Sequence, residues 1–590
     1  MRYSAVSDIY EEIEATTKRL KMTDLLVKFI KDIPKNLVGR VVYLTQGKLY
    51  PDFMGIELGI AEKSILIAIA NATGVRKEEL HSIWKKLGDL GLAAEITLKE
   101  SSTSKVRLLP TEPLTVEDVY NTLDKISKTS GQGAMENRVD TLSQLLGRAT
   151  PKEARYLVRT AAGKLRLGIG DMTILDALAI AYGGGKEARD VVERAYNVSS
   201  DLGLVAETIA EKGLQGIKRF GIEVGRPVRP MLCERRPSAK EVLDKMGGEG
   251  AAEYKYDGLR IQAHVLPKSI SLFSRRLENL TNQFPDVISG LKESLNSTDV
   301  VVEGECVAIN PNTGELQPFQ VVTHRRGRKY EVQETADEIP VVLFLFDILY
   351  LNGETLLDTP YLKRRDALLR VVRETDKIKI THPTIVNDPK KLDELMEEAI
   401  AAGCEGIVVK SLSDDAIYQA GARGFLWIKY KRDYRSEMAD TADLVIVGAY
   451  AGRGKRAGNY GALLMASYDE DIDMFKTVCK LGTGFSDENL SILRKTMEQF
   501  RLDHLHPRVE SKIVADFWFV PIKVLEVRGA ELTLSPSHTC GWGRIRRNSG
   551  LAIRFPRFTG RWREDKASED ATTVKELVEM YQSQLKQIRE

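Results

Sequence analysis

One short segment of the sequence places a lysine among carboxylates and next to an arginine. Residues 253–260 are Glu-Tyr-Lys-Tyr-Asp-Gly-Leu-Arg, and this alternation of aromatic and charged side chains is typical of the end of a strand. Period two places Glu253, Lys255 and Asp257 on one face. A lysine amine without its proton is a nucleophile, and the rigid donor fork of Arg260 suits a phosphate. The alternative, a salt-bridged surface turn, has to be weighed against the residues that follow.

Five later segments add groups of the same chemical kind. Two carboxylates at i and i+2 of a strand, such as Glu303 and Glu305, can hold Mg²⁺, which prefers oxygen ligands and keeps most of its waters. Phe346 lies in an apolar strand, where an aromatic ring can stack on a base. The five segments are residues 274–276, 303–305, 344–348, 405–410 and 427–431.

Two of these segments contain further lysines. Alternation places Trp427, Lys429 and Lys431 on one face of a strand. Glu405 and Lys410 would face opposite ways in a regular strand, so we expect the glycine between them, at position 406, to break that parity. A nucleophilic lysine, arginines, carboxylates and additional lysines together are the groups needed to transfer a nucleotidyl group.

The charges around Lys255 lead to an expectation about its pKa. Lys410, Lys429, Arg260 and Arg275 disfavour a second cation nearby, so we expect them to lower the pKa of the Lys255 amine. The same cations, together with Mg²⁺, would stabilise the charge that builds on a phosphate during transfer. The sequence contains no Walker A motif, which excludes a P-loop NTPase.

Length and composition describe an ordinary multidomain globular protein. The 590 residues predict three to five domains at ~100–200 residues each. The five cysteines share no Cys-x-x-Cys spacing, which argues against a disulfide framework and a structural zinc site. The net charge is only +2, but residues 541–566 contain eight basic residues against Glu564 and Asp565. We expect this stretch to bind a polyanion.

The chain changes character along its length. Residues 1 to about 225 show helical periodicity, with a capping box at Thr150–Glu153. The glycine-rich stretch 163–170 contains Lys164 and Arg166 and would suit a DNA backbone phosphate. Residues 226–230 form a proline-containing extended linker, after which strands and hairpin turns dominate. We expect no signal peptide and no apolar run of the ~20 residues that a membrane span needs.

In this order, the motifs resemble those of the ATP-dependent DNA ligases, in particular the archaeal and eukaryotic replicative type. The resemblance covers nearly the whole chain and includes the final motif at 563–566. It implies a multidomain fold of three parts. These are an all-α DNA-binding domain at 1–236, an α+β nucleotidyltransferase (adenylation) core at 237–436, and an OB-fold β-barrel with a C-terminal helix at 437–590.

The resemblance also implies the site and its chemistry. Lys255 would take AMP from ATP, pass it to the 5′-phosphate of a nick, and allow the 3′-hydroxyl to seal the strand. Glu305 and Glu405 would bind Mg²⁺ or another divalent cation. The implied contacts of the nucleotide and its phosphates are Glu253, Arg260, Arg275, Glu305, Phe346, Lys410, Arg423, Lys429, Lys431 and Arg563.

Finer roles follow from the same resemblance. Phe346 would stack on adenine, and Lys431 would assist the α-phosphate. The remaining roles fall into three pairs or groups: Glu253 and Arg260 on the nucleoside, Arg275 and Lys429 on phosphates, and Arg563 with Asp565 and Lys566 on pyrophosphate.

The implied partner is nicked double-stranded DNA, and a sliding clamp is a further expectation from the family. We expect a monomer in the cytoplasm, or in the nucleus of a eukaryote.

RNA ligases and capping guanylyltransferases are alternatives that share the lysine chemistry, but neither resembles the helical N-terminal block of this chain. NAD-dependent bacterial ligases use a four-cysteine zinc module that these cysteines do not supply. A non-catalytic DNA-binding scaffold would be free to lose Lys255, Glu405 or the pair Lys429 and Lys431, and all four are present.

Overall fold

The computed structural model of the protein describes residues 1–58, 60–104, 112–165, 167–297, 299–328, 332–431, 440–452 and 459–589. The chain forms two compact units. The first contains Met1–Pro230 and Arg276–Asn279, and the second contains Met231–Arg275 and Leu280–Glu590. None of the helices within the described ranges is long and apolar enough to cross a membrane.

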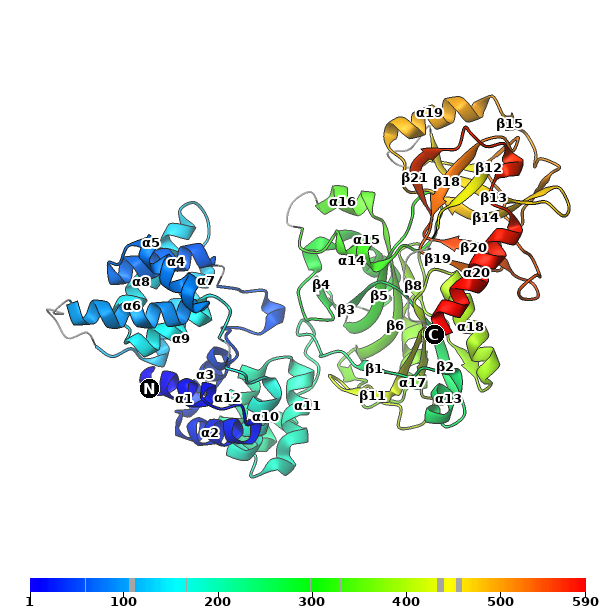
Figure 1. The fold of residues 1–590 in the computed structure, drawn as a ribbon. Helices are drawn as coiled ribbons and strands as arrows, with labels where there is room; N and C mark the ends of the chain where they lie inside the picture. Colours follow the sequence, from blue (N-terminus) through cyan, green and yellow to red (C-terminus); the bar gives the residue numbers. More distant parts are fainter. Residues whose placement is uncertain are drawn as a thin grey trace. The chain divides into compact units, whose positions relative to one another are not determined.

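The first unit is built from helices, shown from blue to cyan in Figure 1. The predicted capping box is confirmed, because the Thr150 hydroxyl accepts from the Glu153 amide while the Glu153 carboxylate accepts from the Thr150 amide. The helices are α1 (Ser4–Glu14), α2 (Arg19–Asp32), α3 (Val38–Thr45), α4 (Glu62–Thr73), α5 (Lys77–Leu87), α6 (Leu90–Ser104), α7 (Val116–Lys128), α8 (Ala134–Arg148), α9 (Pro151–Ala161), α10 (Asp171–Tyr182), α11 (Arg189–Ser199) and α12 (Leu202–Lys218).

The second unit begins with an α+β core that contains two sheets. One has the strand order β1-β11-β10-β2-β9, and the other has the order β4-β3-β5-β6-β7 with β8 paired to β6. The strands are β1 (Leu232–Arg235), β2 (Gly250–Lys255), β3 (Leu259–Leu266), β4 (Ser269–Ser274), β5 (Val300–Ala308), β6 (Val341–Leu351), β7 (Glu354–Thr355), β8 (Ile378–Ile380), β9 (Thr384–Val386), β10 (Gly406–Lys410) and β11 (Arg423–Lys431).

Helices cover these sheets with apolar faces. Val242 of α13 and Ile400 of α18 pack in one core with β2, β10 and β11, and Leu291 of α14 and Leu368 of α17 pack against β3, β5 and β6. The helices are α13 (Ala239–Met246), α14 (Pro285–Ser294), α15 (Phe319–Thr323), α16 (Val332–Glu338), α17 (Tyr361–Val371) and α18 (Pro389–Ala401).

The rest of the second unit is a β-rich domain. An eight-stranded sheet has the order β15-β17-β12-β13-β14-β16, with β18 joining β12 to β21, and β19 pairs with β20. The elements are β12 (Ala442–Ala451), β13 (Tyr460–Asp469), β14 (Met474–Leu481), α19 (Asp487–Glu498), β15 (Arg501–Leu502), β16 (Val509–Glu510), β17 (Phe517–Phe519), β18 (Val524–Arg528), β19 (Glu531–Ser535), β20 (Gly550–Arg554), β21 (Arg557–Trp562) and α20 (Val574–Arg589).

The predicted classes of the three parts are confirmed. In the β-rich domain two short strands, β17 and β18, are separated by a loop that contains Pro521. Proline has no N–H to donate to a neighbouring strand, so it interrupts the ladder at this point.

A buried histidine on β3 gives the core a predictable response to acid. His264 is 1% exposed, its Nε2 lies 2.8 Å from Oε1 of Gln262, and its ring packs edge-on against Phe273. Burial lowers the pKa of His264 to about 3. An unfolded chain takes up this proton near pH 6.5, so the folded state loses stability as the pH falls from about 6.5 towards 3.

His264→Gln should therefore reduce the acid sensitivity of the fold. Between pH 7 and pH 5, the free energy of unfolding of the variant should fall by roughly 2 kcal/mol less than that of the parent. Urea denaturation at the two pH values measures the difference, with the exposed His382→Gln as the control. Equal losses in the parent and His264→Gln would show that His264 does not set this response.

Candidate active site

An ion pair between neighbouring strands holds the lysine singled out by the sequence. Lys255 is the last residue of β2, and its Nζ lies 2.8 Å from Oε2 of Glu405. The Glu405 amide also donates to the Lys255 carbonyl at 2.8 Å, so the two residues are joined through backbone and side chain. Both side chains are about one-quarter exposed, and the amine is therefore accessible from solvent.

The expected break in parity at Gly406 is confirmed. Gly406 and Lys410 on β10 pair with Lys255 and Ala251 on β2, which places Lys410 on the same face as Lys255. Glu405 would face the other way in a regular strand. Gly406 has φ +143°, and this left-handed conformation turns the Glu405 side chain back to Lys255.

The expectation of a lowered pKa at Lys255 is wrong. Burial acts to lower the pKa of this amine, but the carboxylates of Glu405 and then Glu305 outweigh it, and the pKa is raised. Two of the cations that were expected to lower this pKa are themselves paired with other carboxylates. Lys410 lies 3.0 Å from Glu253, and Arg260 lies 2.7 Å from Glu303. These ion pairs neutralise much of the positive charge of Lys410 and Arg260, so the two cations have little effect on Lys255.

Two carboxylates, Glu405 and Glu305, act on the Lys255 amine, and a third, Asp257, lies against Glu405. Burial raises the pKa of Glu305 to about 7, with Lys255 and Arg260 opposing the shift. Burial and the nearby Glu405 carboxylate raise the pKa of Asp257, whereas Lys255 brings the pKa of Glu405 below its usual range against the effect of burial. Carboxylates that are held this close together favour an added cation.

Of the two β5 carboxylates that could hold Mg²⁺, Glu303 and Glu305, only Glu305 is available to a metal. Glu303 is fully buried, and its carboxylate accepts hydrogen bonds from Arg260, Tyr418 and Gln262. It therefore cannot join Glu305 in binding a metal from the strand face. Within the described ranges, no group of three or more His, Cys, Asp or Glu residues is arranged to hold a metal ion. Glu305 with Glu405 fits a cation that keeps most of its water ligands.

An aromatic pair lies beside the Arg260 and Lys410 side chains. Phe346 and Trp427 meet edge-to-face with ring centroids 6.0 Å apart. The Arg260 guanidinium lies 5.2 Å from the Phe346 centroid and 5.7 Å from that of Trp427, and Lys410 donates to the Phe346 carbonyl at 3.0 Å. Nε of Arg260 is buried without a hydrogen-bond partner in the described structure. This unsatisfied donor is a group that a polar ligand can satisfy.

Glu253 is enclosed by residues that the sequence did not indicate. Its side chain is 3% exposed, and Oε1 accepts from the Tyr361 hydroxyl at 2.5 Å and from Lys410 at 3.0 Å. Oε2 accepts from the Thr381 hydroxyl at 2.9 Å. Tyr361 begins α17 and Thr381 follows β8, so no local motif links them to Glu253.

Two lysines and one arginine of β11 form a cationic rim near Lys255. Lys431 Nζ lies 3.8 Å from Glu405. Burial, then the charges of Lys431, Lys255 and Arg423, lower the pKa of Lys429 against an opposing effect of Cys233. Arg423 and Arg275 are exposed, the latter immediately after β4.

Arg563 makes its ion pairs within the β-rich domain. Its Nη1 lies 2.5 Å from Asp443, and its Nε and Nη2 bind Asp565 at 2.9 and 2.7 Å. The structure thus places the final motif on the β-rich domain, at the end of β21, while the other site residues lie on the α+β core.

The basic stretch 541–566 is less positive in the fold than in the sequence. Six of its eight basic residues form ion pairs with carboxylates from elsewhere in the chain, so much of its positive charge is compensated. The pairs are Arg544 with Asp469 and Asp471, Arg546 with Glu394, Arg554 with Glu531, Arg561 with Glu526, and Arg563 and Lys566 with Asp443. Binding of a polyanion to this stretch stays a prediction.

The glycine-rich loop of the first unit adopts the conformations that its glycines allow. Gly163 and Gly168 have φ values of +65° and +72°, in the left-handed region. Lys164 lines a cavity of about 450 Å³ together with Lys48 and Gly168, and Asp171 at the start of α10 lies on the same wall. Arg166 lies outside the described residues.

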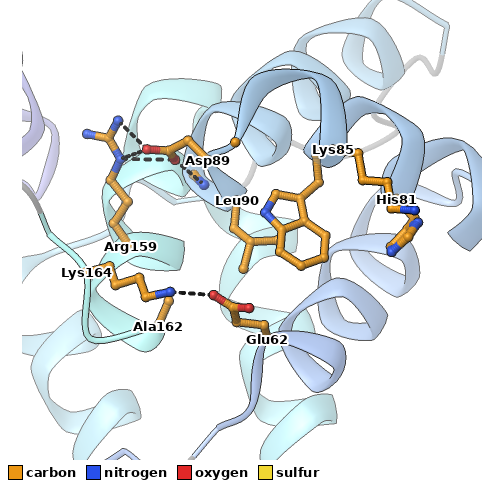
Figure 2. A pocket seen from close by; sticks show the side chains of 11 residues that line it. Glu62, His81, Lys85, Asp89, Leu90, Arg159, Ala162 and Lys164 are labelled. Carbon is orange, nitrogen blue, oxygen red and sulfur yellow. Dashed lines mark hydrogen bonds and ion pairs between the residues drawn. The ribbon is translucent and has the colours of Figure 1, made fainter.

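A second cavity, of about 500 Å³, shares Lys164 (Figure 2). Lys164 forms an ion pair with Glu62 at 2.7 Å, and the buried Arg159 pairs with Asp89 at 2.9 Å. These cations on its wall are therefore compensated. In the first cavity Lys48 is likewise paired, with Asp52 at 2.6 Å, so among the described residues of its wall only the glycine backbone offers uncompensated donors to an anion.

Comparisons with known proteins agree with this architecture. Three family models match in succession: the DNA ligase N terminus at residues 2–179, the ATP dependent DNA ligase domain at 230–431, and the ATP dependent DNA ligase C terminal region at 456–566. DNA ligase 2 of Thermofilum pendens is 53% identical over 99% of this chain and 98% of that protein. The chain belongs to the ATP-dependent DNA ligases.

Other relatives of this ligase show the same full-length similarity. A probable DNA ligase of Aquifex aeolicus is 50% identical and covers 99% of both chains. The DNA ligase of Staphylothermus marinus is 47% identical over the whole of both chains. The function is therefore ATP-dependent joining of DNA, as the sequence motifs predicted, in preference to RNA ligation, capping, NAD-dependent ligation or a scaffold role.

Gly406→Ala should weaken the fold of this ligase and its activity together. An added Cβ would lie 2.5 Å from the Tyr430 carbonyl oxygen and 2.9 Å from the Lys431 Cα, both backbone atoms. We expect a loss of roughly 2 kcal/mol or more in unfolding free energy and at least tenfold slower sealing of nicked DNA with ATP.

Gly353→Ala is the matched control for this substitution. Gly353 also has a left-handed φ, +94°, but nothing lies within 4 Å of an added Cβ. It should lose about 1 kcal/mol through backbone strain alone and keep its sealing rate. If Gly406→Ala sealed nicks as fast as Gly353→Ala, the geometry at Gly406 would not be needed to present Glu405.

Proposed function

We propose that this ligase acts through a covalent adenylate on Lys255. The amine attacks the α-phosphorus of ATP, an N–P bond forms, and the bond to the leaving pyrophosphate breaks. The observation that supports Lys255 best is its partly exposed side chain, whose Nζ lies 2.8 Å from Glu405 and is also influenced by Glu305. Lys410 is 2% exposed and occupied by Glu253, which makes it a poor nucleophile.

The proton on Lys255 is central to this proposal. The pKa of the amine is raised, so it is charged at neutral pH and must lose a proton before it attacks. The Glu405 carboxylate, at 2.8 Å, is the group in position to accept that proton. Binding of ATP would also add negative charge beside Lys255, which Lys429 and Lys431 on the rim of β11 are placed to balance.

Glu305 and Glu405 are the proposed ligands of Mg²⁺ or another divalent cation. Their fit rests on the raised pKa of Glu305 and on its coupling to Glu405 and Asp257, which together describe an excess of carboxylates. When bound, the cation would neutralise charge that develops on the phosphates. The residues of the chain orient the nucleotide around it.

The aromatic pair Phe346 and Trp427 marks the proposed nucleoside site. Phe346 would stack on adenine, and the unsatisfied Nε of Arg260 would donate to the nucleoside or its ribose. Glu253 is already satisfied on both oxygens, so a direct contact with adenine would require Tyr361 or Thr381 to release it. The remaining proposed contacts, on the phosphates, are Arg275, Lys410, Arg423, Lys429, Lys431 and Arg563.

DNA joining would follow in two further steps. AMP passes from Lys255 to the 5′-phosphate at a nick, and the 3′-hydroxyl then attacks that phosphate and releases AMP. The helical part, proposed as residues 1–236, would bind the duplex, with the loop at 163–170 near a backbone phosphate. The adenylation core would span 237–436 and the OB-fold domain 437–590. Monomeric action, a cytoplasmic location and contact with a sliding clamp remain predictions.

Lys255→Arg tests the covalent step while keeping the positive charge. We expect labelling by ATP radioactive at the α-phosphate and ATP-dependent sealing each to fall at least about a thousand-fold. Binding to nicked duplex should stay within about twofold and keep its steep salt dependence, because phosphate contacts release counterions.

Lys245→Ala, a lysine of α13 in the same domain, is the control and should label normally. If Lys255→Arg retained substantial AMP labelling, another residue would be the nucleophile and the proposed assignment would be incorrect.

A further inference from the structure

Asp443 is a buried carboxylate that contacts two residues of the final motif. It lies at the start of β12 and is 8% exposed. Its Oδ2 accepts from Nη1 of Arg563 at 2.5 Å and from Nζ of Lys566 at 2.8 Å. No sequence motif indicated this residue, because it precedes Arg563 by 120 positions.

The backbone of Asp443 is fixed on both sides. Its amide donates to the Thr572 hydroxyl at 2.9 Å, and the Thr572 amide donates to the Asp443 carbonyl at 2.8 Å. β12 is also the strand to which β13, β17 and β18 pair. The carboxylate therefore extends from one of the most constrained strands of the domain, whereas Asp565, the other partner of Arg563, is 61% exposed.

Arg563 and Lys566 keep donors available in this arrangement. Three of the five guanidinium N–H groups of Arg563 are used, two by Asp565 and one by Asp443. Lys566 uses one of its three in the ion pair with Asp443. Within the described part of the chain, both cations are thus oriented by a fixed carboxylate and still able to donate to an added anion.

We propose that Asp443 is a positioning residue for the reaction with ATP, which holds Arg563 and Lys566 side by side so that their remaining donors converge on the pyrophosphate. This inference rests on the proposed function of Arg563 in that step. Two adjacent cations repel each other and their long side chains adopt many rotamers, so a shared, rigid carboxylate reduces both obstacles. Asp443 itself touches no substrate atom.

If Asp443 competed with pyrophosphate instead of positioning the two cations, its removal would change the adenylylation rate in the opposite direction. A carboxylate that competed with pyrophosphate for Arg563 and Lys566 would slow the step, and its removal would accelerate adenylylation. A positioning carboxylate gives slower adenylylation when it is removed. In either case, sealing of nicked DNA that already bears AMP does not use pyrophosphate, so this later step should be insensitive to the change.

The test compares Asp443→Asn, Arg563→Ala and the double variant in two assays of the full-length protein. One assay measures the rate of self-adenylylation with ATP and Mg²⁺, and the other measures sealing of chemically pre-adenylated nicked DNA. We expect Asp443→Asn to slow adenylylation at least about tenfold while sealing stays within about twofold. The double variant should be no slower than Arg563→Ala, because Asp443 is proposed to act through Arg563 and has nothing to position once that side chain is removed.

Asp473→Asn is the matched control. It removes a carboxylate that pairs with Arg508 at 2.5 Å in the same domain, outside the final motif, and should leave both rates unchanged. Asp443→Glu restores the charge and should recover most of the adenylylation rate, which separates positioning from a loss of folding in Asp443→Asn. Thermal unfolding of each variant accompanies the rates.

Each contrary result has a distinct meaning. Faster adenylylation in Asp443→Asn, equal losses in both assays, or additive losses in the double variant would overturn the inference. An unchanged adenylylation rate in Asp443→Asn together with a slow Arg563→Ala would overturn it while leaving the proposed role of Arg563 intact. A normal rate in Arg563→Ala would instead contradict the proposed function on which the inference rests.

Discussion

The ion pair between Lys255 and Glu405 is the interaction on which the site depends. It joins the end of β2 to the residue before β10, and Gly406 makes it possible by turning Glu405 back to the lysine face. The pair keeps the amine charged in the absence of substrate and places a proton acceptor beside it. A protonated amine is not a nucleophile, so under the proposed mechanism a change in the charge balance has to precede the reaction of Lys255.

The same arrangement of fixed carboxylates recurs at the other cations. Glu303 fixes Arg260, Glu253 fixes Lys410, and Asp443 fixes Arg563. A flexible cation gains a defined direction from a buried carboxylate on a strand, and the remaining donors then define where an anion binds. This explains why the proposed site for a highly charged nucleotide contains buried carboxylates beside its cations.

The features that the sequence predicted well depend on local period and spacing. The helices of the first unit, the capping box at Thr150 and the strand positions of Lys255 and Phe346 belong to this class. The order of the motifs also identified the ATP-dependent DNA ligases.

The features that could not be predicted depend on which side chains meet across the sheets. The pKa of Lys255 is raised because Glu405 and Glu305 outweigh the effect of burial, and Arg544 and Arg554 are paired with carboxylates distant in the sequence. Tyr361, Tyr418 and Asp443 have no motif, since only the fold brings them to their partners.

The most direct test is to locate the adenylate by mass spectrometry of the intact ligase and its peptides after incubation with ATP and Mg²⁺. The account predicts one added AMP per chain, on the peptide that contains Lys255, with the bond labile to acid as expected of a phosphoamide. AMP on Lys410, Lys429 or Lys431, or no adduct in a preparation that seals nicks, would contradict the account.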